Sequence, residues 1–256
     1  MDLVEVDSYR LAEGREGLAL RPGERVVAGG TWLFSEPQPG VTGLVDLTTM
    51  GWAPWEPLPD GGLRLAATCT VEQVQRAPWP FPALARQCAD ALLMSFKVAS
   101  AATVGGNLCL GLPAGAMIAL TAALAGEAVL WTPDGGERRL PVAEFVRGPR
   151  LVDLSPGEVL RAVELPGPAL RSPTAFRRAS LTRNGRSAAV VIGRRDPGAG
   201  GAGGPRGGGR GRGPGRLVRR PARGAGLAGR PDRPARGRGV RRTRRSSTVK
   251  LEGAGS

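Results

Sequence analysis

The chain has 256 residues, no histidine and only three cysteines. The lack of histidine excludes Ser-His-Asp and Cys-His catalysis, and also histidine-ligated metal sites, within this chain. The cysteines form no CxxC pair and are too few for a four-cysteine zinc or iron–sulfur site, so we expect reduced, buried thiols. The net charge of +14 is concentrated from Arg194 onward, and the preceding residues are nearly neutral.

The sequence also favours one location for the protein. Its N-terminal segment lacks the basic and then apolar pattern of a signal peptide. The longest apolar run, near residues 116–125, is shorter than the ~20 residues that span a bilayer. An odd number of cysteines without a signal peptide is typical of a reducing compartment. We therefore expect a soluble, cytoplasmic protein without a membrane partner.

Strand and helix patterns alternate along most of the chain. Short apolar runs between turn residues predict strands at 3–6, 25–27, 44–47, 63–67, 158–165, 175–181 and 187–192, and a hairpin at 127–142. Helices are predicted between Gly30 and Pro37, after a capping box at Thr70, at 83–96, and from Pro113 to about residue 124. The mixture predicts an α+β fold, without the regular βαβ alternation of a Rossmann sheet.

Composition divides the chain into three parts. A Pro/Gly-rich segment at 52–62 separates a first subdomain, residues 1–55, from a second, residues 56–192. Residues 193–256 are mainly Arg, Gly, Pro and Ala, which cannot bury enough apolar surface to offset the entropy cost of ordering. We therefore expect a disordered basic tail there.

The first of two glycine pairs follows the strand predicted at 25–27. Glycine permits a sharp turn and lets a ligand approach the backbone closely. The N–H groups at the start of a following helix would attract phosphate. The candidate ligand-binding residues of this loop are Val27, Ala28, Gly29, Gly30, Thr31 and Trp32. Taken alone, the pattern also fits an ordinary strand–turn–helix corner.

A second glycine pair repeats this arrangement in the second subdomain. Its candidate residues are Thr103, Gly105, Gly106, Asn107, Pro113 and Ala114. Thr103 and Asn107 would add side-chain donors beside the glycines. Two such loops in separate subdomains indicate a diphosphate held from both sides. The sequence has no lysine-containing Walker loop and no GxGxxG opening a helix, which disfavours nucleotide hydrolysis and a Rossmann site.

Four ordered segments resemble one family over about residues 3–192. AGGTWLF is similar to the AGGTDL-type segment of the FAD-binding (medium) subunits of molybdenum hydroxylases, of the xanthine dehydrogenase and carbon monoxide dehydrogenase type. ATVGGNLCLGLPAGAM resembles their ATIGGN…SPAGD segment. LPVAEFVRGPRLVDLSPGEVLRAVELP and TAFRRASL resemble the stretches that follow.

The resemblance implies a PCMH-type-like flavoprotein in which two small α/β subdomains clasp FAD. The first loop, from Ala28 to Thr31, would contact the pyrophosphate, and Thr103, Gly105, Gly106 and Asn107 would meet it from the other side. In that family, electrons pass from a molybdenum-cofactor large subunit through a [2Fe–2S] small subunit to the flavin. The hydride chemistry would belong to the cofactor, so no catalytic acid or base is expected in this chain.

The chain departs from the family pattern at three places. Trp32 and Ala116 stand where the family has Asp, and 100–102 replace its usual Arg-Asn pair, so a polar contact to the cofactor is expected to be lost. Two interpretations of Trp32 remain open. It is either a core or interface aromatic residue, or a side chain beside the flavin.

The tail replaces the compact C-terminal domain that the resemblance would lead us to expect. A reading-frame shift in GC-rich coding DNA would produce such an Arg/Gly/Pro run. A second hypothesis is nucleic-acid binding through residues 194–256, because GGPRGGGRGRG resembles RGG-type segments. A third is a solvated linker without a partner. The rival to a flavoprotein is therefore a non-enzymatic phosphate- or RNA-binding protein.

Overall fold

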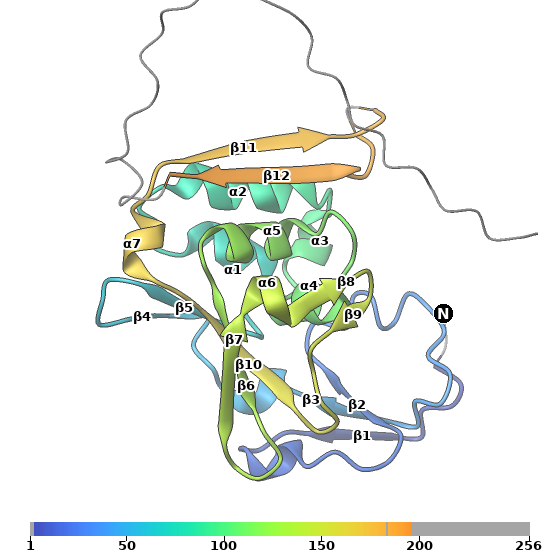
Figure 1. The fold of residues 1–256 in the computed structure, drawn as a ribbon. Helices are drawn as coiled ribbons and strands as arrows, with labels where there is room; N and C mark the ends of the chain where they lie inside the picture. Colours follow the sequence, from blue (N-terminus) through green and yellow to red (C-terminus); the bar gives the residue numbers. More distant parts are fainter. Residues whose placement is uncertain (1–2, 183, 196–256) are drawn as a thin grey trace, which may run out of the picture. The chain divides into compact units, whose positions relative to one another are not determined.

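The computed structural model describes residues 3–182 and 184–195 (Figure 1). Three parallel strands form the first sheet, in the order β1 (Ser8–Leu11), β3 (Gly43–Asp46) and β2 (Glu24–Val27). The central strand β3 is the most buried of the three, as its apolar sequence requires. This order leaves β2 at an edge of the sheet, with the first glycine loop directly after it.

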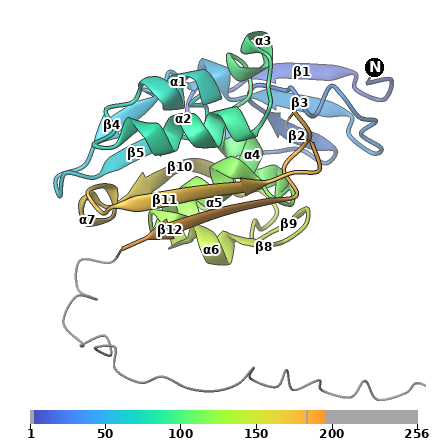
Figure 2. The same ribbon diagram turned by 90° about the horizontal axis from the view of Figure 1, so that it is seen from above.

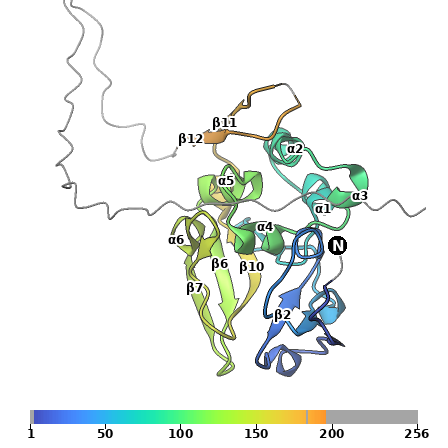
Figure 3. The ribbon, with the colours of Figure 1, turned by 90° about the vertical axis from the view of Figure 1, so that its right-hand side faces the viewer.

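A second sheet has five antiparallel strands. Their order is β4 (Trp55–Pro57), β5 (Leu63–Ala66), β10 (Val159–Leu165), β6 (Glu127–Trp131) and β7 (Glu137–Pro141). The central strand β10 is buried along most of its length. In Figure 3, strands β6, β7 and β10 of this sheet lie at the lower left, and β2 of the first sheet lies at the lower right.

Five helices lie between β5 and β6 in the chain. They are α1 (Val71–Arg76), α2 (Pro82–Ala91), α3 (Phe96–Ala99), α4 (Val104–Leu110) and α5 (Ala116–Ala123). All of them except α3 contribute side chains to the main core. Buried side chains such as Cys88, Leu108 and Leu120 join α2, α4 and α5 to the second sheet in one apolar cluster. Because α4 begins with the second glycine loop, this packing fixes that loop in space.

A hairpin of β11 (Thr174–Ala179) and β12 (Ala189–Arg194) lies across α2 and α5 (Figure 2). Phe176, Val190 and Ile192 project from one face of the hairpin onto the main core. Shorter elements connect the rest: η1 (Glu16–Leu18), η2 (Thr48–Met50), α6 (Val142–Phe145), β8 (Val146–Gly148), β9 (Leu151–Val152) and α7 (Gly167–Leu170).

The α+β class is confirmed, together with most of the predicted strands and the hairpin of β6 and β7. The capping box at Thr70 is also confirmed, since its hydroxyl accepts from the N–H of Gln73 and the Gln73 side chain accepts from the Thr70 N–H. The subdomain boundaries stay a prediction. The tail predicted to be disordered lies outside the described residues from 196 onward, and β12 extends to Arg194, past the change in composition.

Several local predictions were wrong. Residues 3–6 form no strand, and the first strand begins at Ser8. The helix expected before Pro37 is only a turn, because one helical turn cannot offset the cost of nucleation before the proline ends it. The predicted linker contains β4.

Two helix boundaries also differ from the prediction. The helix expected at 83–96 ends at Ala91 and restarts at Phe96, because Leu93 between them has a left-handed φ of 54°. Pro113 precedes α5 instead of opening it, and Gly115 is the N-cap. Among the described residues, no helix has the length and apolar character needed to cross a membrane.

Candidate cofactor-binding site

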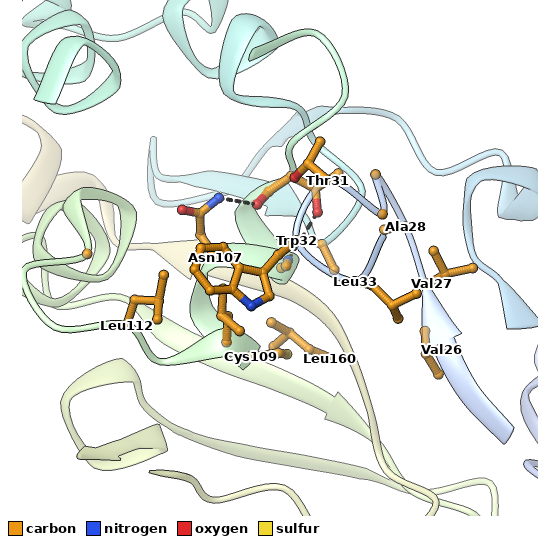
Figure 4. A pocket seen from close by; sticks show the side chains of 18 of the residues that line it. Val26, Val27, Ala28, Thr31, Trp32, Leu33, Asn107, Cys109, Leu112 and Leu160 are labelled. Atoms are coloured by element: carbon orange, nitrogen blue, oxygen red, sulfur yellow. Dashed lines mark hydrogen bonds between the residues drawn. The ribbon is translucent and has the colours of Figure 1, made fainter. Parts of the chain in front are cut away.

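A cavity of about 750 Å³ lies where the two glycine loops meet (Figure 4). Its wall includes every residue that the sequence nominated: Val27, Ala28, Gly29, Gly30, Thr31, Trp32, Thr103, Gly105, Gly106, Asn107, Pro113 and Ala114. Two segments more than seventy residues apart in the chain therefore share one concave surface. The volume lies within the range of small-molecule and cofactor sites.

The first loop offers unpaired backbone donors to this cavity. Gly30 has a left-handed φ of 62°, which turns the chain sharply after β2. Within the part of the chain that the structure describes, the N–H groups of Gly29, Gly30, Thr31 and Trp32 donate no hydrogen bond to protein atoms. Consecutive free N–H groups on a turn of this kind form a concave site for an anion.

The second loop differs from the first, contrary to the expectation that both loops present free amides. The N–H of Gly105 donates to the Ala67 carbonyl at 2.9 Å, and that of Gly106 to the Thr103 hydroxyl at 3.0 Å. The Asn107 N–H donates to the Thr103 carbonyl, also at 3.0 Å. The Asn107 amide donates one N–H to the Thr103 carbonyl at 2.8 Å. Among the described residues, the donors of this loop left without a protein acceptor are the Thr103 N–H, the Thr103 hydroxyl and the second N–H of that amide.

Glycine is required at both loops for a packing reason as well. A Cβ on Gly29 would lie 1.7 Å from the Ala101 carbonyl oxygen, and one on Gly105 would lie 2.7 Å from the Ala67 carbonyl oxygen. Gly29 therefore brings the first loop against the segment that leads into the second. This close approach joins the two halves of the cavity.

Sequence reasoning missed the wall formed by the turn before β10. Leu154, Ser155 and Gly157 line the cavity there, together with Glu158. The LSPGE segment, which was noted only as a resemblance, was the available signal. Arg186 and Ser187, before β12, also line the cavity, and nothing in their local sequence indicated this.

Two carboxylates in the cavity wall are neutralised by arginines. Arg10 donates two hydrogen bonds to Glu24, which lowers the pKa of that carboxyl to about 2. Arg138 donates two hydrogen bonds to Glu158, which likewise lowers its pKa. Because both carboxylates are paired, the wall presents little unbalanced negative charge to a diphosphate.

The chain's thiols are not arranged for chemistry. All three cysteines are free, and burial raises the pKa of each to about 12. Cys109 lines the cavity but is a poor nucleophile in this state. Among residues 3–182 and 184–195, no group of three or more Cys, Asp or Glu side chains could hold a metal ion.

The fold and the cavity define an α+β protein outside the Rossmann class, with a cavity bordered by backbone N–H groups that have no protein acceptor. Residues 8–168 match the family described as the FAD binding domain in molybdopterin dehydrogenase. This match covers more than half of the chain, so the protein belongs to that family and FAD is its cofactor. The free amides of the first loop and the size of the cavity fit a dinucleotide.

Solved structures show the same fold. Quinoline 2-oxidoreductase from Pseudomonas putida 86 matches with a TM-score of 0.65 and 23% identity, covering 75% of this chain and 69% of that chain. CO dehydrogenase from Oligotropha carboxidovorans matches with 0.64 and 21%, covering 74% and 69%. Carbon monoxide dehydrogenase from Hydrogenophaga pseudoflava matches with 0.63 and 19%, covering 73% and 68%. Curated protein sequences gave no significant match.

Proposed function

We propose that this chain is the FAD-binding subunit of a molybdenum-hydroxylase-type dehydrogenase in the cytoplasm. The cofactor would supply the electron transfer, receiving electrons from a molybdenum-cofactor large subunit and a [2Fe–2S] small subunit and passing them to an acceptor. The observation that carries the proposal is the convergence of both glycine loops on one cavity, with free amides on the first. The carbon monoxide dehydrogenases that share this fold support the choice of a molybdenum subunit and a [2Fe–2S] subunit as partners.

In this proposal each of the two loops donates hydrogen bonds to one side of the pyrophosphate. The N–H groups of Gly29 to Trp32 donate to one side of it. The Thr103 hydroxyl and the second N–H of the Asn107 amide would donate from the other side. Val27, Ala28, Pro113 and Ala114 line the same cavity and would supply apolar contacts to the cofactor. The chain contributes binding and orientation, and no residue is assigned as an acid or base.

The test is FAD binding by the full-length chain, measured by absorbance in the flavin bands and by titration with added FAD. Gly30→Ala should weaken binding, because its Cβ would lie 2.3 Å from the Phe34 ring and the backbone has a positive φ. Gly51→Ala is the matched control, since its φ of 65° is nearly the same and its Cβ would meet nothing within 4 Å.

The rival function predicts a different set of results. A colourless protein that takes up no FAD, yet binds RNA in a manner that deletion of residues 194–256 abolishes, would overturn the proposal. FAD uptake by wild-type and Gly51→Ala protein, with weaker uptake by Gly30→Ala, would support it. Co-expression with a molybdenum subunit and a [2Fe–2S] subunit then tests the assembly, with co-purification as the expected result.

A further inference from the structure

A second, smaller cavity of about 320 Å³ shares part of its wall with the large one, including Trp32, Cys109 and Leu110. The indole lines both cavities, whereas Arg150 lines only the smaller one. The Arg150 guanidinium lies over the Trp32 ring, with its central carbon 5.5 Å from the ring centroid. The ring and its cation therefore lie beside the small cavity, and the ring also borders the large one.

Contacts from both halves of the cavity hold this ring in place. The Trp32 Nε1–H donates to Glu36 at 3.2 Å, and Arg150 pairs with the same carboxylate at 3.1 Å. Trp32 and Glu36 follow β2, while Arg150 lies between β8 and β9. The Arg150 N–H also donates to the Gly111 carbonyl at 2.9 Å, which anchors its backbone to the end of α4. The indole is thus oriented before any ligand arrives.

The position of the Trp32 ring, next to the free N–H groups of the first loop, indicates which kind of ligand it would contact. Trp32 is the last residue of the loop whose free N–H groups suit a diphosphate, and its side chain lines the same cavity as Asn107 and Cys109 (Figure 4). Both ends of FAD are planar heteroaromatic rings, which stack well on an electron-rich indole. Ala116 is fully buried and lies outside the cavity wall, so it supplies no polar contact there.

We propose that Trp32 is a stacking platform for one of the two ring systems of the bound dinucleotide, with Arg150 and Glu36 as positioning residues. The proposal rests on the proposed FAD-binding function and adds a ring contact to it. Trp32 is then a ligand-binding residue, not only a core aromatic. Trp32 would contribute apolar contact area to the bound cofactor, in place of the hydrogen bonds that Asp at positions 32 and 116 would make.

The first test is titration of the full-length protein with FAD, FMN and ADP, followed by flavin fluorescence and equilibrium dialysis. Trp32→Leu should weaken FAD binding roughly 5- to 150-fold, the range expected for loss of one base–aromatic stack, while Trp32→Phe should retain most of the affinity. A loss confined to ADP identifies the adenine ring as the stacked group, and a loss confined to FMN identifies the isoalloxazine ring. Equal affinity of wild-type and Trp32→Leu protein for all three ligands refutes the platform.

The second test separates positioning from general stability. Arg150 does not line the large cavity, so Arg150→Met should weaken FAD binding only by releasing the Trp32 ring. The tryptophan emission should shift with it. Arg147→Met is the matched control, because Arg147 is as exposed as Arg150, pairs with Asp153 and lines neither cavity. In the Trp32→Leu background, Arg150→Met should cause no further loss.

The outcomes distinguish the two proposals. Wild-type protein that takes up no FAD overturns the proposed function, and the platform with it. If wild-type protein binds FAD and Trp32→Leu protein binds it equally well, the function stands and the platform is overturned. If Arg150→Met and Arg147→Met behave alike, or if the Trp32 and Arg150 losses are additive, the positioning role of Arg150 is overturned. Melting temperatures of each variant show whether a loss of binding reflects unfolding.

Discussion

Replacing Gly29 by alanine should damage both the stability of the protein and its cavity. The new Cβ would lie 1.7 Å from the Ala101 carbonyl oxygen, whereas real Cβ contacts stay beyond 3.0 Å. The two segments must therefore separate by more than an ångström. Both partners are backbone, so no side chain can rotate to relieve the clash. Overpacking of this kind costs roughly 2–3 kcal/mol of unfolding free energy.

For a folded region of this size, that cost lowers the melting temperature by roughly 5–10 °C. Thermal unfolding followed by circular dichroism measures it, and FAD titration should show weaker binding because the first loop moves away from the second. Gly148→Ala is the control, since its added Cβ would meet nothing within 4 Å. If Gly29→Ala and Gly148→Ala protein have the same melting temperature, the close approach of the two segments is refuted.

Three further predictions concern stability and reactivity. Glu24→Gln should destabilise the protein at neutral pH, because the ion pair with Arg10 lowers the pKa of the Glu24 carboxyl from 4.5 to about 2. The stabilisation from this ion pair is present above pH 4.5 and is lost as the pH falls toward 2. The melting temperatures of variant and wild-type protein should therefore converge near pH 2. Thr70→Ala should cost about 1 kcal/mol by removing the N-cap of α1, measured by urea unfolding. Cys69 and Cys88, which are buried and have pKa values raised to about 12, should resist iodoacetamide at pH 8 until the protein is unfolded. Rapid labelling of these two thiols in the native protein would contradict their burial.

Local sequence signals predicted the parts of the fold that depend on local physics. The hairpin of β6 and β7 follows from alternating apolar residues around a Pro-Asp-Gly-Gly turn, and α1 follows from its capping box. The exceptions depend on distant partners. β4 forms within a Pro/Gly-rich segment because β5 provides a neighbour for it, pairing Trp55 with Leu65 and Pro57 with Leu63. Leu93, which ends α2, has no sequence signature for its positive φ.

The two glycine pairs show why the site could be located from the sequence but not described in detail. Both loops have a Gly-Gly pair, but Gly29 and Gly30 follow β2 and leave their N–H groups without protein acceptors. Gly105 and Gly106 lie in the first turn of α4 and donate theirs to Ala67 and Thr103. The difference arises because α4 begins directly at the second pair and packs on the end of β5, so its first amides cap the helix and join the core. The first pair is followed by a turn, with no helix to consume its donors. Anion binding should therefore depend on backbone geometry at the first loop and on side-chain identity at the second.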